Sequence, residues 1–482
     1  MRPLVWLRAD LRLDDHAALD DAATRARGSG GDVVAVFVVS AAQWRAHDWA
    51  DARVELLRRS LIALSDALAA RNVPLRLIDA PHFGDVPDAL AQLADALDRT
   101  ALVFHREHEV NEQRRDAAVA ERFRADGRDV RVFDDQCILP PGSVRTQDGA
   151  IYKVYTPFRK RWLDVHAASD ASAPQPPIEA PSAAMACDPD PIPDRFGDFD
   201  PSALRDDLWP AGEAAARARL DAFVASRAGT YHARRDTPSV PGTSELSAAL
   251  ALGLLSPRRA LREARVANDD QIDGGDDGLS GWMRQLIWRD FYRHILDGFP
   301  RISMNRPFQL HTEAVAWRDD GDELAAWQAG RTGYPIVDAG MRQLARTGWM
   351  HNRLRMITAM FLSKHLLLDW RLGERHFMRH LIDGDLANNN GGWQWSASTG
   401  TDAAPYFRIF NPWTQGKRFD ADGGFIRRFV PELADAPKAA LHDPRRLAAW
   451  RSDHPAVDYP SPIVEHKTGR ARALAAFKEL AS

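Results

Sequence analysis

The first 134 residues alternate between two hydrophobic patterns. Five short runs rich in β-branched and aromatic residues lie at 3–7, 33–39, 75–78, 101–104 and 130–133. Segments with the spacing of amphipathic helices separate most of these runs, for example 52–70 and 86–98. Strands that alternate with helices favour a parallel sheet that is covered by helices on both faces. We therefore expect residues 1–134 to form an α/β domain.

The pattern changes after residue 134. Residues 135–205 are loop-rich, and the part from 170 to 198 is dense in Pro, Ala, Ser and Asp, which is typical of a linker that lies over the surface. From residue 206 onward helical spacing dominates, as in 282–296, 341–348 and 349–370. The sequence therefore predicts an α/β domain at 1–134, a linker at 135–205 and a large all-helical domain at 206–482.

Composition excludes several classes of protein. The formal net charge of −4 argues against a general polyanion binder, so any contact with nucleic acid needs a local basic face. Cys137 and Cys187 lie far apart and have no further ligand nearby in the sequence, so we expect neither a disulfide nor a zinc site. No apolar run reaches the roughly 20 residues that cross a bilayer, and the N-terminal apolar stretch is too short for a secretory signal. We expect a cytoplasmic protein that binds no membrane.

Common catalytic motifs are missing from the sequence. There is no G-x-G-x-x-G after the first strand, no G-x-x-x-x-G-K-S/T, no H-E-x-x-H and no G-x-S-x-G. The sequence HREHE at 105–109 contains metal-capable side chains, but it follows a strand and lacks clear ligand spacing. We expect a solvated loop there, and no metal.

Tryptophan is concentrated in the helical part, where nine of the 15 tryptophans lie between residues 282 and 413. On a helical pitch, one face of the helix predicted at 282–296 carries Trp282, Gln285, Arg289 and Tyr292, with Trp288 one step round. A face that mixes indole, amide and guanidinium groups has two interpretations. It is the polar rim of a half-buried helix, or it is the wall of a cavity that stacks on and hydrogen-bonds a flat polar ligand.

The next predicted helix repeats this pattern. Spacings of three and four residues place on one side Trp349, Asn352, Arg355 and Met356. A buried Arg355 needs a counter-charge, for which Asp383 and Asp385 are candidates, whereas an ordinary surface ion pair is the alternative.

The segment GTSELS at 242–247 places three hydroxyls, those of Thr243, Ser244 and Ser247, at the expected start of a helix. Hydroxyls and N–H groups at a helix start can bind a pyrophosphate without a Gly-rich loop. The alternative is an ordinary N-cap with Glu245 nearby.

Several long blocks resemble one known family along nearly the whole chain. They are VWLRADLRLDDHAAL (5–19), GTSELSAALALGLLSPR (242–258), LIWRDFYRH (286–294), TGYPIVDAGMRQLARTGWMHNRLRM (332–356), DGDLANNNGGWQWSASTGTDAAPYFRIFNP (383–412) and DYPSPIVEHK (458–467). In order and spacing they resemble the DNA photolyase and cryptochrome family, closest to the bacterial class I enzymes that split cyclobutane pyrimidine dimers and carry a folate antenna. The resemblance implies light-driven DNA repair by electron transfer from photoexcited reduced FAD.

The resemblance also implies roles for individual residues. The family's pocket for a folded, U-shaped FAD falls on Tyr231, Thr243, Ser244, Leu246, Ser247, Trp282, Arg289, Asn352, Arg355, Asp383, Asp385 and Asn389. Asn389 would lie beside the flavin N5, where an amide can partner both protonation states. Arg355 paired with Asp383 would lie at the ring edge, where a fixed cation stabilises an anionic reduced flavin.

A relay and a substrate pocket are implied in the same way. Three indoles match the family's chain that carries electrons between the surface and the flavin: Trp393, Trp370 and Trp317. The lesion would be flipped out of the duplex, as the family does with its substrate, against Trp288 and Trp395, with Gln285, Met356 and Asn352 touching it. DNA phosphates would be contacted by Arg235, Arg289, Arg353 and Gln415, with salt-sensitive affinity. UV-damaged DNA is thus the expected partner, and a monomer the expected state.

One position departs from the dimer-splitting group. Gln285 stands where that group usually has Glu, and an amide cannot give a proton to the bases. Glutamine there is more frequent in animal cryptochromes and (6-4) photolyases, but those relatives carry paired histidines near the position of Asn352, which this chain lacks. A cryptochrome-like photoreceptor and a (6-4) photolyase are therefore the alternatives. The short stretch of 15 residues after Lys467, without the long tail of many photoreceptors, favours repair.

The antenna residues show a second departure. His47, Asn111 and Glu112 match the family's 5,10-methenyltetrahydrofolate site, but Met304 stands where a Lys is familiar. The resemblance implies folate as the second pigment, with weaker binding or a different pigment as the alternative. Asn111 and Glu112 can also be read as the cap of a helix start.

Overall fold

The computed structural model describes residues 1–169, 174–402 and 407–481, and the chain divides into two compact units. The first unit contains Met1–Gly229, Ser244–Ser303 and Ile382–Asp385, and the second contains Thr230–Thr243, Met304–Leu381 and Leu386–Ser482. The first unit thus combines the predicted α/β domain and linker with part of the predicted helical domain. The domain boundaries at 134 and 205 stay a prediction.

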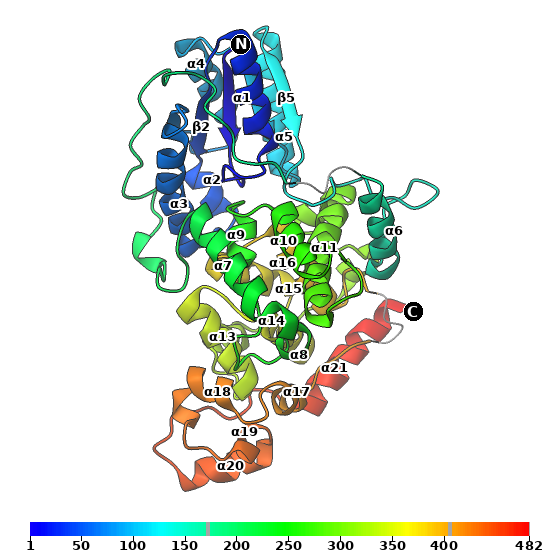
Figure 1. The fold of residues 1–482 in the computed structure, drawn as a ribbon. Coiled ribbons are helices and arrows are strands. Elements are labelled where there is room, and N and C mark those ends of the chain that lie inside the picture. The colour runs from blue at the N-terminus through cyan, green and yellow to red at the C-terminus, as the bar shows by residue number, and fades with distance from the viewer. Residues whose placement is uncertain (170–173, 403–406, 482) are drawn as a thin grey trace. The chain divides into compact units, whose positions relative to one another are not determined.

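A five-stranded parallel sheet forms the centre of the first unit (Figure 1). Its strands are β1 (Pro3–Leu7), β2 (Val34–Val39), β3 (Leu75–Asp79), β4 (Ala101–His105) and β5 (Asp129–Phe133). All five predicted strands are confirmed within one residue at each end. They are arranged in the order β3-β2-β1-β4-β5, so the order reverses between β1 and β4.

Helices cover both faces of the sheet. The helices of the first unit are α1 (Ala17–Ser29), α2 (Ala41–Ala46), α3 (Asp51–Ala69), α4 (Val86–Ala96), α5 (Val110–Ala125), α6 (Tyr155–Ala167), α7 (Glu213–Ser226), α9 (Ser247–Ala251), α10 (Pro257–Ala267) and α11 (Asp277–Gly298). One face of the sheet packs Trp6 and Phe104 against α4 and α5, through Leu90 and Phe123 among others. Alternate strand residues such as Val5 are also buried, as expected for strands with helices on both sides.

The linker segment covers an edge of the sheet. Its residues 170–173 lie outside the described part of the chain, and Asp190 lies beside the edge strand β3. The backbone N–H of Asp190 donates to the carbonyl of Leu75 (2.9 Å), and its carboxylate accepts from the N–H of Leu77 (2.8 Å). Arg76 pairs with the same carboxylate at 2.9 Å. Covering these groups removes an open strand edge that other chains could pair with.

The second unit is helical. Its helices are α8 (Tyr231–Arg234), α12 (Gly321–Gln328), α13 (Pro335–Thr347), α14 (Asn352–Met360), the π-helix η5 (Phe361–Leu366), α15 (Trp370–His380), α16 (Leu386–Ala397), α17 (Pro412–Phe419), α18 (Gly424–Phe429), α19 (Lys438–Leu441), α20 (Pro444–Asp453) and α21 (His466–Lys478). The short 3-10 turns of the chain are η1 (Pro201–Ala203), η2 (Ala228–Thr230), η3 (Pro300–Met304), η4 (Leu310–Ala314), η6 (Pro431–Leu433) and η7 (Glu479–Ala481). A parallel-sheet α/β part followed by an all-helical remainder confirms the predicted fold class. No helix in the described stretches is both long and apolar enough to cross a membrane, and Cys137 and Cys187 are both free thiols, so the prediction of no disulfide is confirmed.

The single helix predicted over 349–370 is wrong. Gly348 has a positive φ of 66° and ends α13, and the side chain of His351 caps the start of α14 by accepting from the N–H of Arg353. Leu367, with φ of 54°, ends the π-helix before α15 begins at Trp370. Trp349 consequently lies in the turn before α14 and does not extend the face formed by Asn352, Arg355 and Met356.

A buried carboxylate fixes the start of α13. Asp338 is inaccessible to solvent and accepts from the N–H and hydroxyl of Thr332 and from the N–H of Gly333. The hydroxyl of Tyr459 donates to it at 2.5 Å, which ties the C-terminal segment to this helix. Burial raises the pKa of Asp338, although these donors lower it.

We predict that Gly253→Ala destabilises the first unit by about 3 kcal/mol, the sum of overpacking and left-handed backbone strain. Gly253 has φ of 65°, and an added Cβ would lie 2.6 Å from Cα of Asp10 and closer still to the carbonyl of Ala9. Urea unfolding measures the change. Gly28→Ala in α1 is the control, because a Cβ there meets nothing within 4 Å. Equal midpoints for the two variants would contradict the packing argument.

Candidate functional site

The predicted face of α11 divides into a core part and a half-buried part. Trp282 is only 3 % exposed and packs against Phe223 with ring centroids 5.1 Å apart. Gln285 is half-buried, and its amide nitrogen donates back to the carbonyl of Gly281 at 3.3 Å. Trp282 therefore contributes to the packing of α7 on α11, and the half-buried residues of the face are the ones that remain near the surface of this unit.

Arg289 is held by the backbone. Its guanidinium donates to the carbonyls of Gln136 and Leu250, the latter at 3.2 Å, and burial lowers its pKa. These bonds place its charge in a fixed position between two segments of the first unit. The roles of Arg289 toward flavin and DNA stay predictions.

Asp385 has a partner that the sequence did not suggest. Arg293, which follows Arg289 by one helical turn on α11, forms a buried ion pair with Asp385. Asp385 raises the pKa of Arg293 above its usual range, against the effect of burial. Arg293, from the same unit, is thus one counter-charge of Asp385, and a pairing of Asp385 with Arg355 stays a prediction. The only sequence signal was the four-residue spacing from Arg289, and it was not recognised.

Trp288 has one face covered by a stacked tyrosine. The rings of Tyr155 and Trp288 lie 3.6 Å apart, centroid to centroid, and are inclined by only 8°. The hydroxyl of Tyr155 donates to the carbonyl of Arg284 at 3.1 Å, and Phe291 meets both rings edge-on. Offset and stacked aromatic packing of this kind fixes the plane of the indole. Tyr155 was missed because it lies 133 positions from Trp288 in the sequence.

The GTSELS segment ends in a short helix without a side-chain cap. Helix α9 begins at Ser247, and the residue in the N-cap position is Leu246, which makes no side-chain capping bond. Glu245 precedes it with a positive φ of 53°. The N-cap position of α9 is thus not occupied by a hydroxyl residue, and pyrophosphate binding at this helix start stays a prediction. Thr243 belongs to the second unit and Ser244 to the first.

Helix α14 of the second unit has a polar side and an apolar side. Asn352 is exposed, and Arg355 and Met356 are half-buried, whereas Leu354 and Ile357 are in the core. The Nε–H of Arg355 donates to the carbonyl of Met350 at 2.8 Å. The predicted face thus points away from the core of its own unit. Asp383, the predicted partner of Arg355, belongs to the first unit, and their pairing stays a prediction.

The predicted phosphate contacts Arg235 and Arg353 both lie near one acid. Arg353 pairs with Asp236 at 2.8 Å, and the guanidinium of Arg235 lies 5.9 Å from the ring of Tyr231. Tyr231 is buried, which raises its pKa to about 12. Arg235, Arg353 and Tyr231 therefore form one cluster in the second unit. His351 lies beside this cluster, because the charges of Asp236 and Arg353 both influence the pKa of this histidine.

Asn389 is anchored on the neighbouring helix. Its amide nitrogen donates to the carbonyl of Glu374 at 3.1 Å, and Asn390 donates to the carboxylate of the same residue at 2.9 Å. Gln394 in turn donates to the side-chain oxygen of Asn390 at 2.7 Å. This chain of amides fixes α16 against α15 and determines which end of the Asn389 amide points away from α15.

The tryptophans of the predicted relay differ in exposure. Trp393 and Trp370 are 2 % and 1 % exposed, and Trp317 is half-buried with its ring 6.0 Å from that of Phe477. The order from buried to partly exposed is the one that a relay to the surface requires.

Trp395 packs beside a cation that the sequence did not single out. The guanidinium of Arg408 lies 4.6 Å from its ring centroid, and the ring of Phe410 lies 6.5 Å away. Both rings are half-buried, as is Gln415 on α17. Part of the preceding block, residues 403–406, lies outside the described residues. An indole with a guanidinium on its face offers both stacking and charge.

The three predicted antenna residues meet in the first unit. Nδ1 of His47 lies 3.2 Å from a carboxylate oxygen of Glu112, and Nε2 lies 3.1 Å from the amide nitrogen of Asn111. Gln43, which the sequence reasoning missed, contacts the same Nε2 at 3.0 Å. Glu109 is the N-cap residue of α5 without a side-chain bond, so Asn111 and Glu112 do not act as a helix cap. Met304, the departure from the family pattern, is 54 % exposed and belongs to the second unit.

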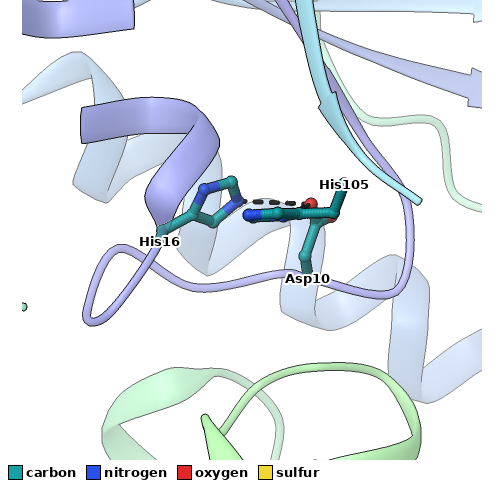
Figure 2. Close-up of side chains that lie close together, drawn as sticks. All are labelled: Asp10, His16 and His105. Atoms are coloured by element: carbon teal, nitrogen blue, oxygen red, sulfur yellow. Dashed lines mark hydrogen bonds and ion pairs between the residues drawn. The ribbon is translucent and has the colours of Figure 1, made fainter. Parts of the chain in front are cut away.

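A buried Asp-His-His cluster lies where the strand order reverses. Asp10 follows β1, His16 caps α1 and His105 ends β4, and Figure 2 shows both rings directed at the Asp10 carboxylate. His105 Nδ1 lies 2.7 Å and His16 Nε2 lies 3.3 Å from the same oxygen. Crevices at this point of an α/β sheet commonly bind ligands, and three such donor groups can hold a metal ion. The prediction of a solvated loop at HREHE is therefore wrong for its first residue, His105, which is only 3 % exposed.

The tautomers of the two rings decide against a metal. Nδ1 of His16 accepts from the N–H of Leu19 (3.1 Å), and Nε2 of His105 accepts from the N–H of Ala18 (3.3 Å). Since each far nitrogen accepts a backbone proton, the nitrogen that faces Asp10 carries the ring's own proton and has no lone pair for a metal. The two histidines are therefore hydrogen-bond donors to an ionised Asp10 and hold the pKa of this carboxylate well below its usual range.

Comparison with known proteins identifies the family. A model described as DNA photolyase matches residues 3–182, and one described as the FAD binding domain of DNA photolyase matches 282–479. Proteins named deoxyribodipyrimidine photo-lyase are 46 % identical in Salmonella typhimurium and 45 % identical in Escherichia coli, each match covering 98 % of both chains. The crystal structure of a bacterial class III photolyase from Agrobacterium tumefaciens has a TM-score of 0.87 at 35 % identity and covers 100 % of this chain and 98 % of its own. A cryptochrome structure from Synechocystis has a TM-score of 0.83 at 28 % identity and covers 98 % and 99 %.

These findings define a flavin-dependent light-driven protein class with an α/β part and a helical part. Within it, the chain belongs to the DNA photolyase family, as the resemblance of its sequence blocks implied.

We predict that the stability of the first unit falls as the pH decreases through about 6.5, and that His16 contributes to this fall. Burial lowers the pKa of His16, so the unfolded chain takes up this proton more readily than the folded one. Stability from this group is present above pH 6.5 and is lost below it. The lowered pKa of Asp10 acts only at more acidic pH, below its unfolded value.

His16→Asn tests this prediction, because asparagine keeps a helix-capping acceptor but cannot titrate. Urea unfolding midpoints between pH 7.5 and 5.5 should fall more steeply for the wild type than for the variant. Parallel slopes would show that His16 makes no contribution.

Proposed function

We propose that the protein is a light-dependent DNA repair enzyme, a deoxyribodipyrimidine photo-lyase that splits cyclobutane pyrimidine dimers. The observation that carries this proposal is the match over nearly the full length to relatives with that name at up to 46 % identity. The match includes both the N-terminal and the FAD-binding family models. UV-damaged DNA is the partner that this activity requires.

The residues of both units fit FAD as the cofactor. In the first unit the start of α9, where no hydroxyl residue occupies the N-cap position, is the proposed place for the pyrophosphate. In the second unit the polar side of α14 and the anchored amide of Asn389 are the proposed contacts to the flavin. FAD bound in its reduced form supplies, after light absorption, the electron that opens the cyclobutane ring and then takes it back. The protein's own part is to hold, orient and keep water from the reacting groups.

Fixed charge and fixed amides are the protein's main contributions in this proposal. Asn389 presents an amide that can donate to or accept from a nitrogen, and its anchor on Glu374 prevents it from turning away. Arg355 supplies positive charge on the polar side of α14, with Asp383 as the proposed partner. Preorganised dipoles of this kind act without reorganisation cost at the moment of reaction.

The substrate side combines aromatic surfaces with cations. Trp288, stiffened by Tyr155, and Trp395, flanked by Arg408, provide flat apolar faces for a flipped dimer. Met356 and Asn352 on the polar side of α14 would touch the lesion. Arg235, Arg353, Arg289 and Gln415 are the proposed contacts to DNA phosphates, so that affinity falls with rising salt.

Gln285 bears on which lesion is repaired. Its amide can hydrogen-bond a pyrimidine carbonyl but cannot transfer a proton to it, so repair of cyclobutane dimers would rely on hydrogen bonding alone at this position. The same residue motivates the (6-4) photolyase as the second candidate, and the 28 % identical cryptochrome structure motivates a photoreceptor. The names of the relatives with 42–46 % identity favour dimer repair over both.

We also propose 5,10-methenyltetrahydrofolate as an antenna pigment held by His47, Asn111 and Glu112. The contacts among these three side chains across α2 and α5 support a polar site in the first unit. That the enzyme works as a monomer in the cytoplasm is likewise a proposal.

The central experiment uses purified, flavin-loaded protein reduced with dithionite and an oligothymidine that carries a cyclobutane dimer. We expect restoration of intact thymines under blue light and none in the dark. The recovery of thymine absorbance measures this restoration. Activity on (6-4) products alone would reassign the lesion. Bound flavin with no repair of either lesion would move the protein to the photoreceptor class.

The antenna proposal predicts that His47→Ala removes a near-ultraviolet absorption band from the purified protein and leaves the flavin bands in place. His47 contacts both of the other antenna residues, so its loss opens the site. His82→Ala is the matched control, because His82 is an exposed histidine of the same unit. An unchanged spectrum for His47→Ala would refute this placement of the pigment.

A further inference from the structure

The indole of Trp393 on α16 lies directly on the backbone of α15 at Gly373. A Cβ built on Gly373 would come within 2.5 Å of Cζ3 of Trp393, and closer still to Cη2. It would also lie 2.6 Å from Cδ2 of Leu362. Real Cβ atoms do not approach other heavy atoms this closely, so any larger residue at this position must displace the indole or the helix.

Steric room is the reason for a glycine at this position. Gly373 lies inside α15, where its φ is not positive, so no left-handed backbone requires it. Glycine is a poor helix former, and its presence in a helix interior needs a compensating reason. The close approach of Trp393 is such a reason. Gly392, one residue before Trp393 on α16, gives a contrast within the same unit, because a Cβ added there would meet nothing within 4 Å.

Aromatic side chains fix the ring of Trp393 on its other sides. The ring of Phe377 meets it edge-on at 4.9 Å between centroids and 78° between planes. The ring of Trp327 lies 6.0 Å away at 73°, and its Nε1–H is held by the carbonyl of Thr358 at 3.1 Å. With only 2 % of its surface exposed, Trp393 has one position available in this socket.

The helix face that receives Trp393 is the face that carries Trp370. Trp370, Gly373 and Phe377 follow one another at spacings of three and four residues, so they form one row along α15. Gly373 is the gap in this row, and the indole of Trp393 lies in this gap and packs against Phe377. The absence of a side chain at Gly373 therefore sets how near the indole of Trp393 lies to that of Trp370.

We propose that Gly373 is a positioning residue for electron transfer between Trp370 and Trp393. The proposal rests on the proposed function, in which these two tryptophans belong to the relay that delivers electrons to the flavin. In the step concerned, Trp393 has given one electron to the light-excited oxidised flavin and is left as a radical cation. One electron then passes from Trp370 to Trp393, which becomes neutral again, and the positive charge moves to Trp370.

The remaining electrons also balance. Trp317 reduces Trp370 in the same manner, and an external thiol reductant restores Trp317. Because the rate of electron transfer falls steeply with the distance between ring edges, a displacement of Trp393 by a methyl group slows the step from Trp370. Repair by flavin that is already reduced does not use this relay, since its electron goes to the dimer and returns.

Gly373→Ala and the matched control Gly392→Ala test the proposal. Under blue light with a thiol reductant, we expect reduction of bound flavin to slow by about tenfold or more in Gly373→Ala, as a small misplacement of reacting groups does, and to stay unchanged in Gly392→Ala. Transient absorption should show a correspondingly slower appearance of the surface tryptophan radical. Dimer repair after reduction with dithionite should be the same in both variants and the wild type.

A readout without flavin separates positioning from general damage. Near-ultraviolet circular dichroism of the flavin-free proteins should change for Gly373→Ala, since the environment of Trp393 changes, and should not change for Gly392→Ala. Photoreduction by Gly373→Ala at the rate of the control would overturn the proposal.

A second variant covers the case in which Gly373→Ala does not fold. Leu362→Ala removes the side chain packed at the same point and lets the indole move, so it should slow photoreduction and leave repair by reduced enzyme intact. Unchanged photoreduction there would equally overturn the proposal. Failure of the proposed function looks different, because the dithionite-reduced wild type would then repair no dimer.

Discussion

Buried charge, and the need to pair it, holds the first unit together. Arg12 is 1 % exposed and binds both carboxylate oxygens of Asp135, at 2.6 and 2.7 Å. Arg258, from α10, bridges Asp135 and Asp15 at 3.0 and 2.9 Å. An unpaired charge in such a place costs several kcal/mol, so each member requires the others. The network joins the loop after β1 to α10, and through the packing of α10 it sets the position of α11, which carries Trp282, Trp288 and Arg289.

The same loop determines what the sheet can bind. In open α/β sheets the crevice at the reversal of strand order is the usual ligand site, and here Asp10, His16 and His105 fill it with hydrogen bonds. The antenna residues His47 and Asn111 instead follow β2 and β4 at the same edge of the sheet. The side chains of Asp10, His16 and His105 thus occupy the place of a conventional dinucleotide site at this end of the sheet, and a ligand bound there has to lie beside them. This agrees with the missing Gly-rich loop in the sequence.

The fold could be predicted from local pattern, and the site only in part. Alternating strand and helix periods located all five strands because each pattern is contained within a few residues. The break before α15 was missed because it depends on the left-handed backbone at Leu367, which a run of helix-forming neighbours conceals. Family blocks named the residues of the site, but partners from distant segments, such as Tyr155 on Trp288 and Arg293 on Asp385, are set by tertiary packing that no short window contains.

Burial gives the proposed relay a direction. A cation is costly in a site without water or counter-charge and less costly near the surface. Trp393 and Trp370 are almost completely buried, whereas Trp317 is half-buried, so a positive charge that starts at Trp393 becomes better solvated when it reaches Trp317. The rigid socket around Trp393 keeps the first separation short, and the exposure gradient opposes the return of the charge. The close packing of Trp393 and the partial exposure of Trp317 therefore both favour the movement of positive charge away from the flavin. The first follows from the positions of α15 and α16.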